Sequence, residues 1–178
     1  MHREILRFWF EEIDHSQWWA KDDDFDKLII ERFADTHARA TRCELFEWRA
    51  EAQGRLAEII VLDQFSRNMF RGSPFSFAQD SLALALAQEA VSAKADKALS
   101  PIERNFLYMP FMHSESLKIH EVAMDMFRNN GIQSSLDFEI KHKRIIERFG
   151  RYPHRNSVLG RESTAEEIEF LKQPGSGF

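Results

Sequence analysis

Apolar residues recur along the chain at spacings of three and four, which is the period of an amphipathic α-helix. The pattern is clear in Phe25, Ile29 and Phe33, whose helix we expect to begin at a cap on Asp24 and to run to about Arg42. No stretch alternates apolar and polar residues between turn signals as a half-buried strand would. The pattern therefore predicts an all-α protein.

The same pattern, with capping residues and glycine or proline stops, predicts the remaining helices. Because proline removes a backbone hydrogen bond, Pro110 should kink or break its helix near Met109. Short turns join the segments, so we expect antiparallel helical hairpins. No linker divides residues 1–178, which predicts one domain. The expected segments are residues 5–9, 55–70 (after Gly54), 76–93, 101–109, 115–130, 134–149 and a short one after Thr164.

Composition narrows the class of partner. The hydrophobic fraction of 43%, with 16 Phe and 4 Trp, is enough for a compact core. A net charge of -5 gives no electrostatic reason to expect nucleic acid or an anionic membrane surface. No apolar run has the roughly 20 residues that a spanning helix needs, and the charged N-terminus lacks a signal-peptide pattern. With Cys43 as the sole cysteine, we expect a cytoplasmic protein without disulfides.

Polar residues gather first in residues 62–71, directly after the most apolar predicted helix. Asp63 and Arg67 are four residues apart, so they share one helix face and can pair. Gln64 and Asn68 extend the polar surface. The group is either an exposed ion pair at the rim or a partly buried pair whose further partners belong to a site.

The second polar group follows Pro110. His113 and Glu115 come next in the chain, and His120 lies two turns beyond His113 on the same predicted face. This spacing is weak as a metal pair, because helical pairs usually stand four residues apart. His113 has either a structural role or a site role, whereas His142 on the following helix is typical of a satisfied core histidine.

The third polar group is the predicted loop of residues 149–161, which two glycines and a proline brace. It holds Arg151, His154, Arg155 and Asn156. Arginine side chains form flat, bidentate contacts with carboxylates or phosphates. These arginines either bind a ligand or neutralise helix C-termini and internal carboxylates such as Asp63.

The motifs of several enzyme classes are missing from the sequence. It has no glycine-rich phosphate loop, no HExxH zinc motif and no GxSxG nucleophile elbow. We therefore predict neither a cofactor nor a metal.

Five segments resemble, in order, one bacterial family: the domain-of-unknown-function family nine-two-four. They are ILRFWF (5–10), LDQFSRNMFRG (62–72), YMPFMHSE (108–115), FGRYPHRN (149–156) and GSGF (175–178). The resemblance covers essentially the whole chain. It implies a tetratricopeptide-like helical fold and brings no agreed catalytic activity.

Three hypotheses about function remain open. In the first, a helical stack is a binding module whose groove takes an anionic small molecule or peptide through Arg67, Arg151, Arg155 and Asn156. In the second, the protein is an enzyme, and acid–base or metal-assisted chemistry uses a different set of residues. That set is Asp63, His113, Glu115, His142 and His154. In the third, all of these residues form an internal polar network. The oligomeric state is left open.

Overall fold

The computed structural model describes residues 1–177, and these form helices and connecting loops with no β-strand. The all-α prediction is confirmed. The α-helices are α1 (His2–Arg7), α2 (Asp23–Thr41), α3 (Ala52–Ile60), α4 (Ser66–Met69), α5 (Asp80–Ser92), α6 (Pro101–Met112), α7 (Leu117–Asn130), α8 (Gln133–Phe149) and α9 (Ala165–Leu171). Two segments, η1 (Phe8–Glu12) and η4 (Val61–Phe65), are π-helical. Short 3-10 turns are η2 (His15–Trp18), η3 (Phe46–Ala50), η5 (Pro74–Phe77), η6 (Ala95–Ala98) and η7 (Pro153–Arg155).

Some helix starts follow the capping signals of the sequence, and others do not. The side chains of Ser100 and Glu103 form a capping box at the start of α6, with Pro101 in the first helical position. The predicted cap on Asp24 is wrong. Asp22 caps α2 instead, because its carboxylate accepts the free N–H groups of the first turn.

Three expected boundaries are also wrong. The helix expected from residue 76 begins later, as α5 at Asp80, after the 3-10 turn η5. Helix α6 continues through Pro110 to Met112. A proline in the last turn removes only the bond to a carbonyl four residues earlier, and this loss does not break the helix. Gly54 does not precede the third helix but lies inside α3, where an added Cβ atom would clash with the Trp48 carbonyl oxygen.

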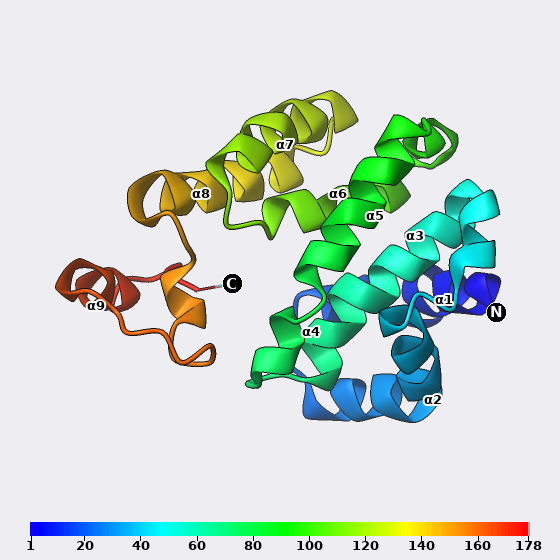
Figure 1. Cartoon of the computed structure of the whole chain (residues 1–178), viewed down its shortest axis with the longest axis horizontal. Coiled ribbons are helices and arrows are strands. Elements are labelled where there is room, and N and C mark those ends of the chain that lie inside the picture. Colours follow the sequence, from blue (N-terminus) through cyan, green and yellow to red (C-terminus); the bar gives the residue numbers. More distant parts are fainter. Residues whose placement is uncertain (178) are drawn as a thin grey trace.

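Helix α3 lies at the centre of the molecule, and its helical path continues through η4 into α4. It packs against α1, α5 and α6 (Figure 1). Because α3 is covered on several sides, Leu56, Ile59 and Ile60 are fully buried. This central position places Asp63 and Gln64 of η4 and Ser66 of α4 inside the protein.

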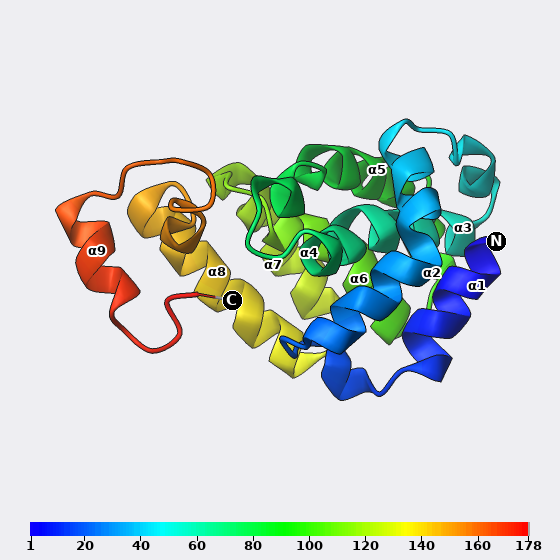
Figure 2. The ribbon, with the colours of Figure 1, turned by 90° about the horizontal axis from the view of Figure 1, so that it is seen from below.

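Helices that are adjacent in sequence also pack together, α6 against α7 and α7 against α8 (Figure 1). This is the hairpin arrangement that the short turns predicted. A separate small apolar cluster of Ile145, Ile146 and Tyr152 joins α8 to the η7 loop. The α9 end lies opposite the N-terminus in both ribbon views (Figures 1 and 2). The η7 loop therefore has to reach back toward α5 and α6 to contact the main core.

Candidate functional site

A buried aspartate and a histidine form the centre of the polar cluster. Asp63 lies in the π-helical η4 and has no exposed surface. Its Oδ1 atom lies 2.7 Å from Nδ1 of His113, the residue that caps the C-terminus of α6. Its Oδ2 atom accepts a hydrogen bond from the Gln64 side chain at 2.5 Å. The extra residue in a π-helical turn changes which side chains face inward, and such turns are frequent at functional sites.

The environment keeps Asp63 ionised. Burial acts to raise the pKa of this carboxyl, but attraction to His113 and Arg67 outweighs it and lowers the pKa to about 2. Because an ionised carboxylate is only an acceptor, Nδ1 of His113 donates the hydrogen bond. The pair therefore fixes both the orientation and the tautomer of the His113 ring.

Asp80 at the start of α5 joins two arginines from distant parts of the chain. Both Nη atoms of Arg67 donate to its carboxylate, at 2.7 and 3.0 Å. Nη1 of Arg155 donates to the same carboxylate at 3.1 Å. The predicted pair of Arg67 with Asp63 is present only as a longer contact of 3.9 Å. The group thus holds the η7 loop against α4 and α5.

Arg155 is buried, whereas a side chain on an exposed site loop would be open to solvent. Its residue surface is 6% exposed, and its guanidinium lies 4.6 Å from the ring centres of both Phe77 and Tyr152. Nη2 donates to the His113 carbonyl at 3.1 Å, while Nε has no hydrogen-bond partner among residues 1–177. Burial and the charge of Arg67 lower the pKa of Arg155. A buried, partly unsatisfied cation favours a negative or hydrogen-bonding neighbour.

A cavity of about 290 Å³ opens beside these residues. Its walls come from η5, α5, the end of α6 and the η7 loop. Its polar lining consists of Asp80, Ser81, His113, Ser114, Glu115 and Arg155. Its apolar lining consists of Pro74, Phe77, Ala78, Leu84, Pro110 and Leu159. The cavity is large enough for a small molecule and combines an apolar wall with a few convergent polar groups.

Glu115 fixes the loop that forms one wall of this cavity. Its carboxylate accepts two hydrogen bonds from Arg161, at 2.7 and 2.9 Å, and one from the backbone N–H of Tyr152 at 2.7 Å. Burial acts to raise the pKa of Glu115, but Arg161 and this N–H lower it overall. Glu115 is therefore an ionised partner of the loop, which argues against its use as a proton donor.

A second histidine–carboxylate pair lies in the interior behind the cavity. His120 and Glu139 are fully buried, with 2.7 Å between Nδ1 and Oε1. Burial raises the pKa of Glu139, against the opposing effect of His120. Nε2 of His120 lies 2.9 Å from the Ser114 carbonyl and 3.1 Å from the Tyr152 hydroxyl. The sequence had suggested that His120 shares a helix face with His113, but it does not, because α6 ends at Met112 and His120 belongs to the next helix, α7.

The other two histidines of the prediction pack around Tyr152. The ring centres of His142 and His154 both lie 5.6 Å from that of Tyr152. Burial lowers the pKa of His142 to about 3. Burial, together with Arg155 and Arg67, lowers the pKa of His154 to about 4. Both rings are therefore neutral at physiological pH.

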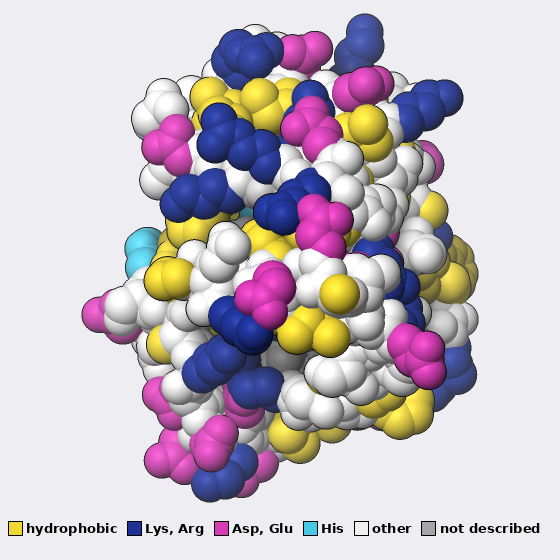
Figure 3. Space-filling model, turned by 90° about the vertical axis from the view of Figure 1, so that its left-hand side faces the viewer, with side chains coloured by type: hydrophobic (Ala, Val, Ile, Leu, Met, Phe, Trp, Pro, Cys, Tyr) yellow, Lys and Arg dark blue, Asp and Glu magenta, His cyan; other side chains and the backbone are white. Residues whose placement is uncertain are grey.

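Three predicted site residues lie elsewhere. Asn68 donates to Asp26 of α2 at 2.8 Å. Arg151 binds Glu167 at the start of α9, and Asn156 bonds Ser163 and Arg161 within the loop. These contacts join neighbouring elements and do not face the cavity. Figure 3 shows the α8 and α9 end of the molecule, where basic and acidic side chains are interspersed.

Sequence reasoning missed several members of the cluster, namely Asp80, Tyr152, Glu139 and Arg161. Asp80 lies in an alanine- and leucine-rich segment, outside the three polar groups of the sequence. A single signal was present for Tyr152, an aromatic residue within an arginine-rich loop. Arg161 lay in the predicted arginine-rich loop but was not assigned to the site, because its partner Glu115 is 46 residues away. Glu139 carried no signal, because its partner His120 is 19 residues away in the chain.

The described residues contain neither a metal-binding cluster nor a membrane-spanning helix. Residues 1–177 contain no group of three or more histidine, cysteine, aspartate or glutamate side chains arranged to hold a metal ion. Within the same residues, every helix is too short or too polar to span a bilayer.

Comparison with known proteins gives a family and a fold. No curated protein matches. The chain is similar to a solved structure of a protein of unknown function from Agrobacterium tumefaciens, with 40% sequence identity, 96% coverage of each chain and a TM-score of 0.91. The model of a bacterial family of unknown function matches residues 5–175. The chain therefore belongs to the DUF924 family of bacterial proteins of unknown function.

Proposed function

We propose that the cavity beside His113 is the active site of an acid–base enzyme that acts on a small anionic molecule. The observation that carries this proposal is the contact of the buried, ionised Asp63 with Nδ1 of His113 at 2.7 Å. A carboxylate in this position holds a histidine in one tautomer and stabilises the imidazolium that forms when the ring takes up a proton.

His113 is suited to proton transfer because its other ring nitrogen is available. Nδ1 keeps its proton for Asp63, so Nε2 is the ring nitrogen that can take up or release a proton. Nε2 has no hydrogen-bond partner within residues 1–177, and the side chain lines the cavity at 18% exposure. A substrate proton within hydrogen-bond reach of Nε2 would move to it, and the reverse step would return it.

The choice of an anionic substrate rests on Arg155. One N–H group of each Nη atom is committed, to Asp80 and to the His113 carbonyl, and the remaining N–H groups are unused. Asp80 is shared with Arg67, so the two arginines are only partly neutralised by it. A carboxylate or phosphate group in the cavity would accept hydrogen bonds from the unused N–H groups and neutralise the remaining positive charge.

Exchange of substrate hydrogen with solvent tests this proposal without knowledge of the full reaction. The protein is incubated in D2O with pools of small carboxylic acids and phosphate esters, and deuterium incorporation is followed by mass spectrometry. We expect incorporation into at least one acid, and its loss in His113→Gln. The matched control is His15→Gln, because His15 is exposed and far from the cavity in sequence.

A binding module is the second candidate, and the same cavity and Arg155 favour it. Its signature is stabilisation of the protein by an anion in thermal unfolding, with unchanged affinity in His113→Gln and no exchange. If no pooled acid binds or exchanges, the acid–base proposal is refuted, and the internal polar network becomes the better account of these residues.

We also propose that the whole chain acts as one domain in the cytoplasm. The bond of Arg155 to Asp80 supports a single domain, because it ties the C-terminal loop to the main core. The lone, exposed Cys43 supports a reducing compartment.

A further inference from the structure

A second and larger cavity, of about 460 Å³, lies between α5, η6, α6 and α7. It is distinct from the cavity beside His113 and shares none of its lining residues. Apolar walls come from Val91, Val122 and Met126. The other lining residues are Asp96, Lys97, Arg104, Tyr108, Glu121, Asp125, Asn129 and Asn130.

Asp96 is a buried carboxylate with one oxygen unused. The residue is 2% exposed, and the Tyr108 hydroxyl donates to its Oδ2 atom at 2.7 Å. The ammonium of Lys97 lies 3.2 Å from the same oxygen. Oδ1 is buried and has no hydrogen-bond partner in residues 1–177. A buried acceptor without a donor is unfavourable, so Oδ1 favours a ligand that donates.

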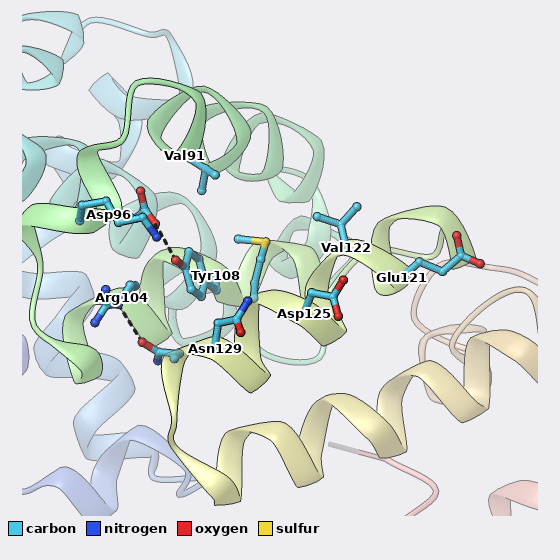
Figure 4. A pocket seen from close by; sticks show the side chains of 11 residues that line it. Val91, Asp96, Arg104, Tyr108, Glu121, Val122, Asp125 and Asn129 are labelled. Carbon is cyan, nitrogen blue, oxygen red and sulfur yellow. Dashed lines mark hydrogen bonds and ion pairs between the residues drawn. The ribbon is translucent and has the colours of Figure 1, made fainter.

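Negative charge also lies at the far end of this cavity. Figure 4 shows Asp96 at one end and Glu121 at the other, with Val91 and Val122 between them. Asp125 stands one turn after Glu121 on α7, and both are exposed. The lining thus presents an acid, an apolar stretch and then two further acids.

We propose that this cavity binds a linear alkyl diammonium ion. One ammonium group donates to Oδ1 of Asp96, the other lies near Glu121 and Asp125, and the methylene chain packs between Val91 and Val122. The position of the Lys97 ammonium shows that the Asp96 carboxylate accommodates such a group. The Lys97 side chain is 71% exposed, so it can leave when a ligand enters.

The cavity also contains two cationic side chains, which could instead favour an anionic ligand. Arg104 donates through Nε to the Asn130 side chain at 2.8 Å, and its Nη atoms are uncommitted within residues 1–177. With Lys97 it makes two cations among the lining residues, against the three carboxylates Asp96, Glu121 and Asp125. Arg128, outside the lining, already pairs with Asp125 at 2.6 Å. The cationic ligand is therefore favoured by the unpartnered Oδ1 of Asp96 and by Glu121, whereas a site governed by Arg104 would take a dicarboxylate.

Isothermal titration with 1,4-diaminobutane tests the proposal, with 1,4-butanediol and succinate as neutral and anionic probes of similar length. We expect saturable binding of the diamine alone. Glu121→Gln, at an exposed position that tolerates change, should weaken binding several-fold, and Asp96→Asn should weaken it about tenfold or more, a difference of about 1.4 kcal/mol. His113→Gln should leave diamine affinity unchanged, which separates this site from the proposed active site.

Binding of succinate in preference to the diamine would overturn the proposal in favour of an anion site. Absence of saturation at millimolar diamine, or equal affinity in wild type and Glu121→Gln, would overturn it outright. Because Glu121→Gln needs no change in the core, the result does not depend on the folding of Asp96→Asn.

Discussion

The buried His142 should make the protein less stable as the pH falls below neutrality. Its pKa is lowered from 6.5 to about 3 by burial, and its Nδ1 donates to the Phe138 carbonyl at 2.8 Å. The folded state therefore keeps this ring neutral where the unfolded chain binds a proton. For a depressed histidine pKa, the stability is fully present above pH 6.5 and is lost as the pH falls toward the folded pKa.

The size of the effect follows from these two values. At about pH 5.5 the protonated form of the ring in the unfolded chain exceeds the neutral form about tenfold. Protonation therefore stabilises the unfolded state by RT ln 11, about 1.4 kcal/mol. At about pH 7.5 the same expression gives about 0.1 kcal/mol. Urea denaturation at the two pH values measures the difference. In His142→Gln, which cannot titrate but keeps an N–H donor, the drop in unfolding free energy should be smaller by about 1.3 kcal/mol.

The control is His15→Gln, at an exposed position, which should show the full drop of the wild type. If His142→Gln loses as much stability as the wild type between the two pH values, the reasoning is wrong, and the pH dependence must come from other groups. An increase of wild-type stability on acidification would contradict the sign of the argument.

Two further predictions concern single close contacts. Arg155→Ala should destabilise the fold by about 3 kcal/mol, because it removes a buried ion-pair partner and the packing between Phe77 and Tyr152. Arg155→Lys keeps the charge and should lose less stability. Urea denaturation measures both changes, and a loss under about 1 kcal/mol for Arg155→Ala would indicate an exposed residue. Gly54→Ala should destabilise by about 3 kcal/mol through the clash with the Trp48 carbonyl, although helix propensity alone predicts a gain of about 1 kcal/mol. A rise in Tm for Gly54→Ala would therefore refute the close approach.

The sequence by itself determined the class of the fold and most helix ends. The three- and four-residue period defines an apolar face for each helix, and a local signal such as Ser100 with Glu103 forms its contacts within one turn. Gly131 and Gly150 adopt the left-handed conformation that ends α7 and α8. This conformation depends only on the residues next to each glycine. Such features need no knowledge of the distant chain.

Only the tertiary structure decided which polar residues meet. Asp63 faces His113, 50 residues later, and Asp80 faces Arg155, 75 residues later. Periodicity tells which face of a helix is buried, but the rotation of that face against its neighbours depends on packing across the whole core. The π-helical turn at Asp63 adds to this, because one extra residue rotates all later positions by roughly 100°. The sequence therefore indicated the residue types of the candidate site, and the packing of helices far apart in the chain chose their partners.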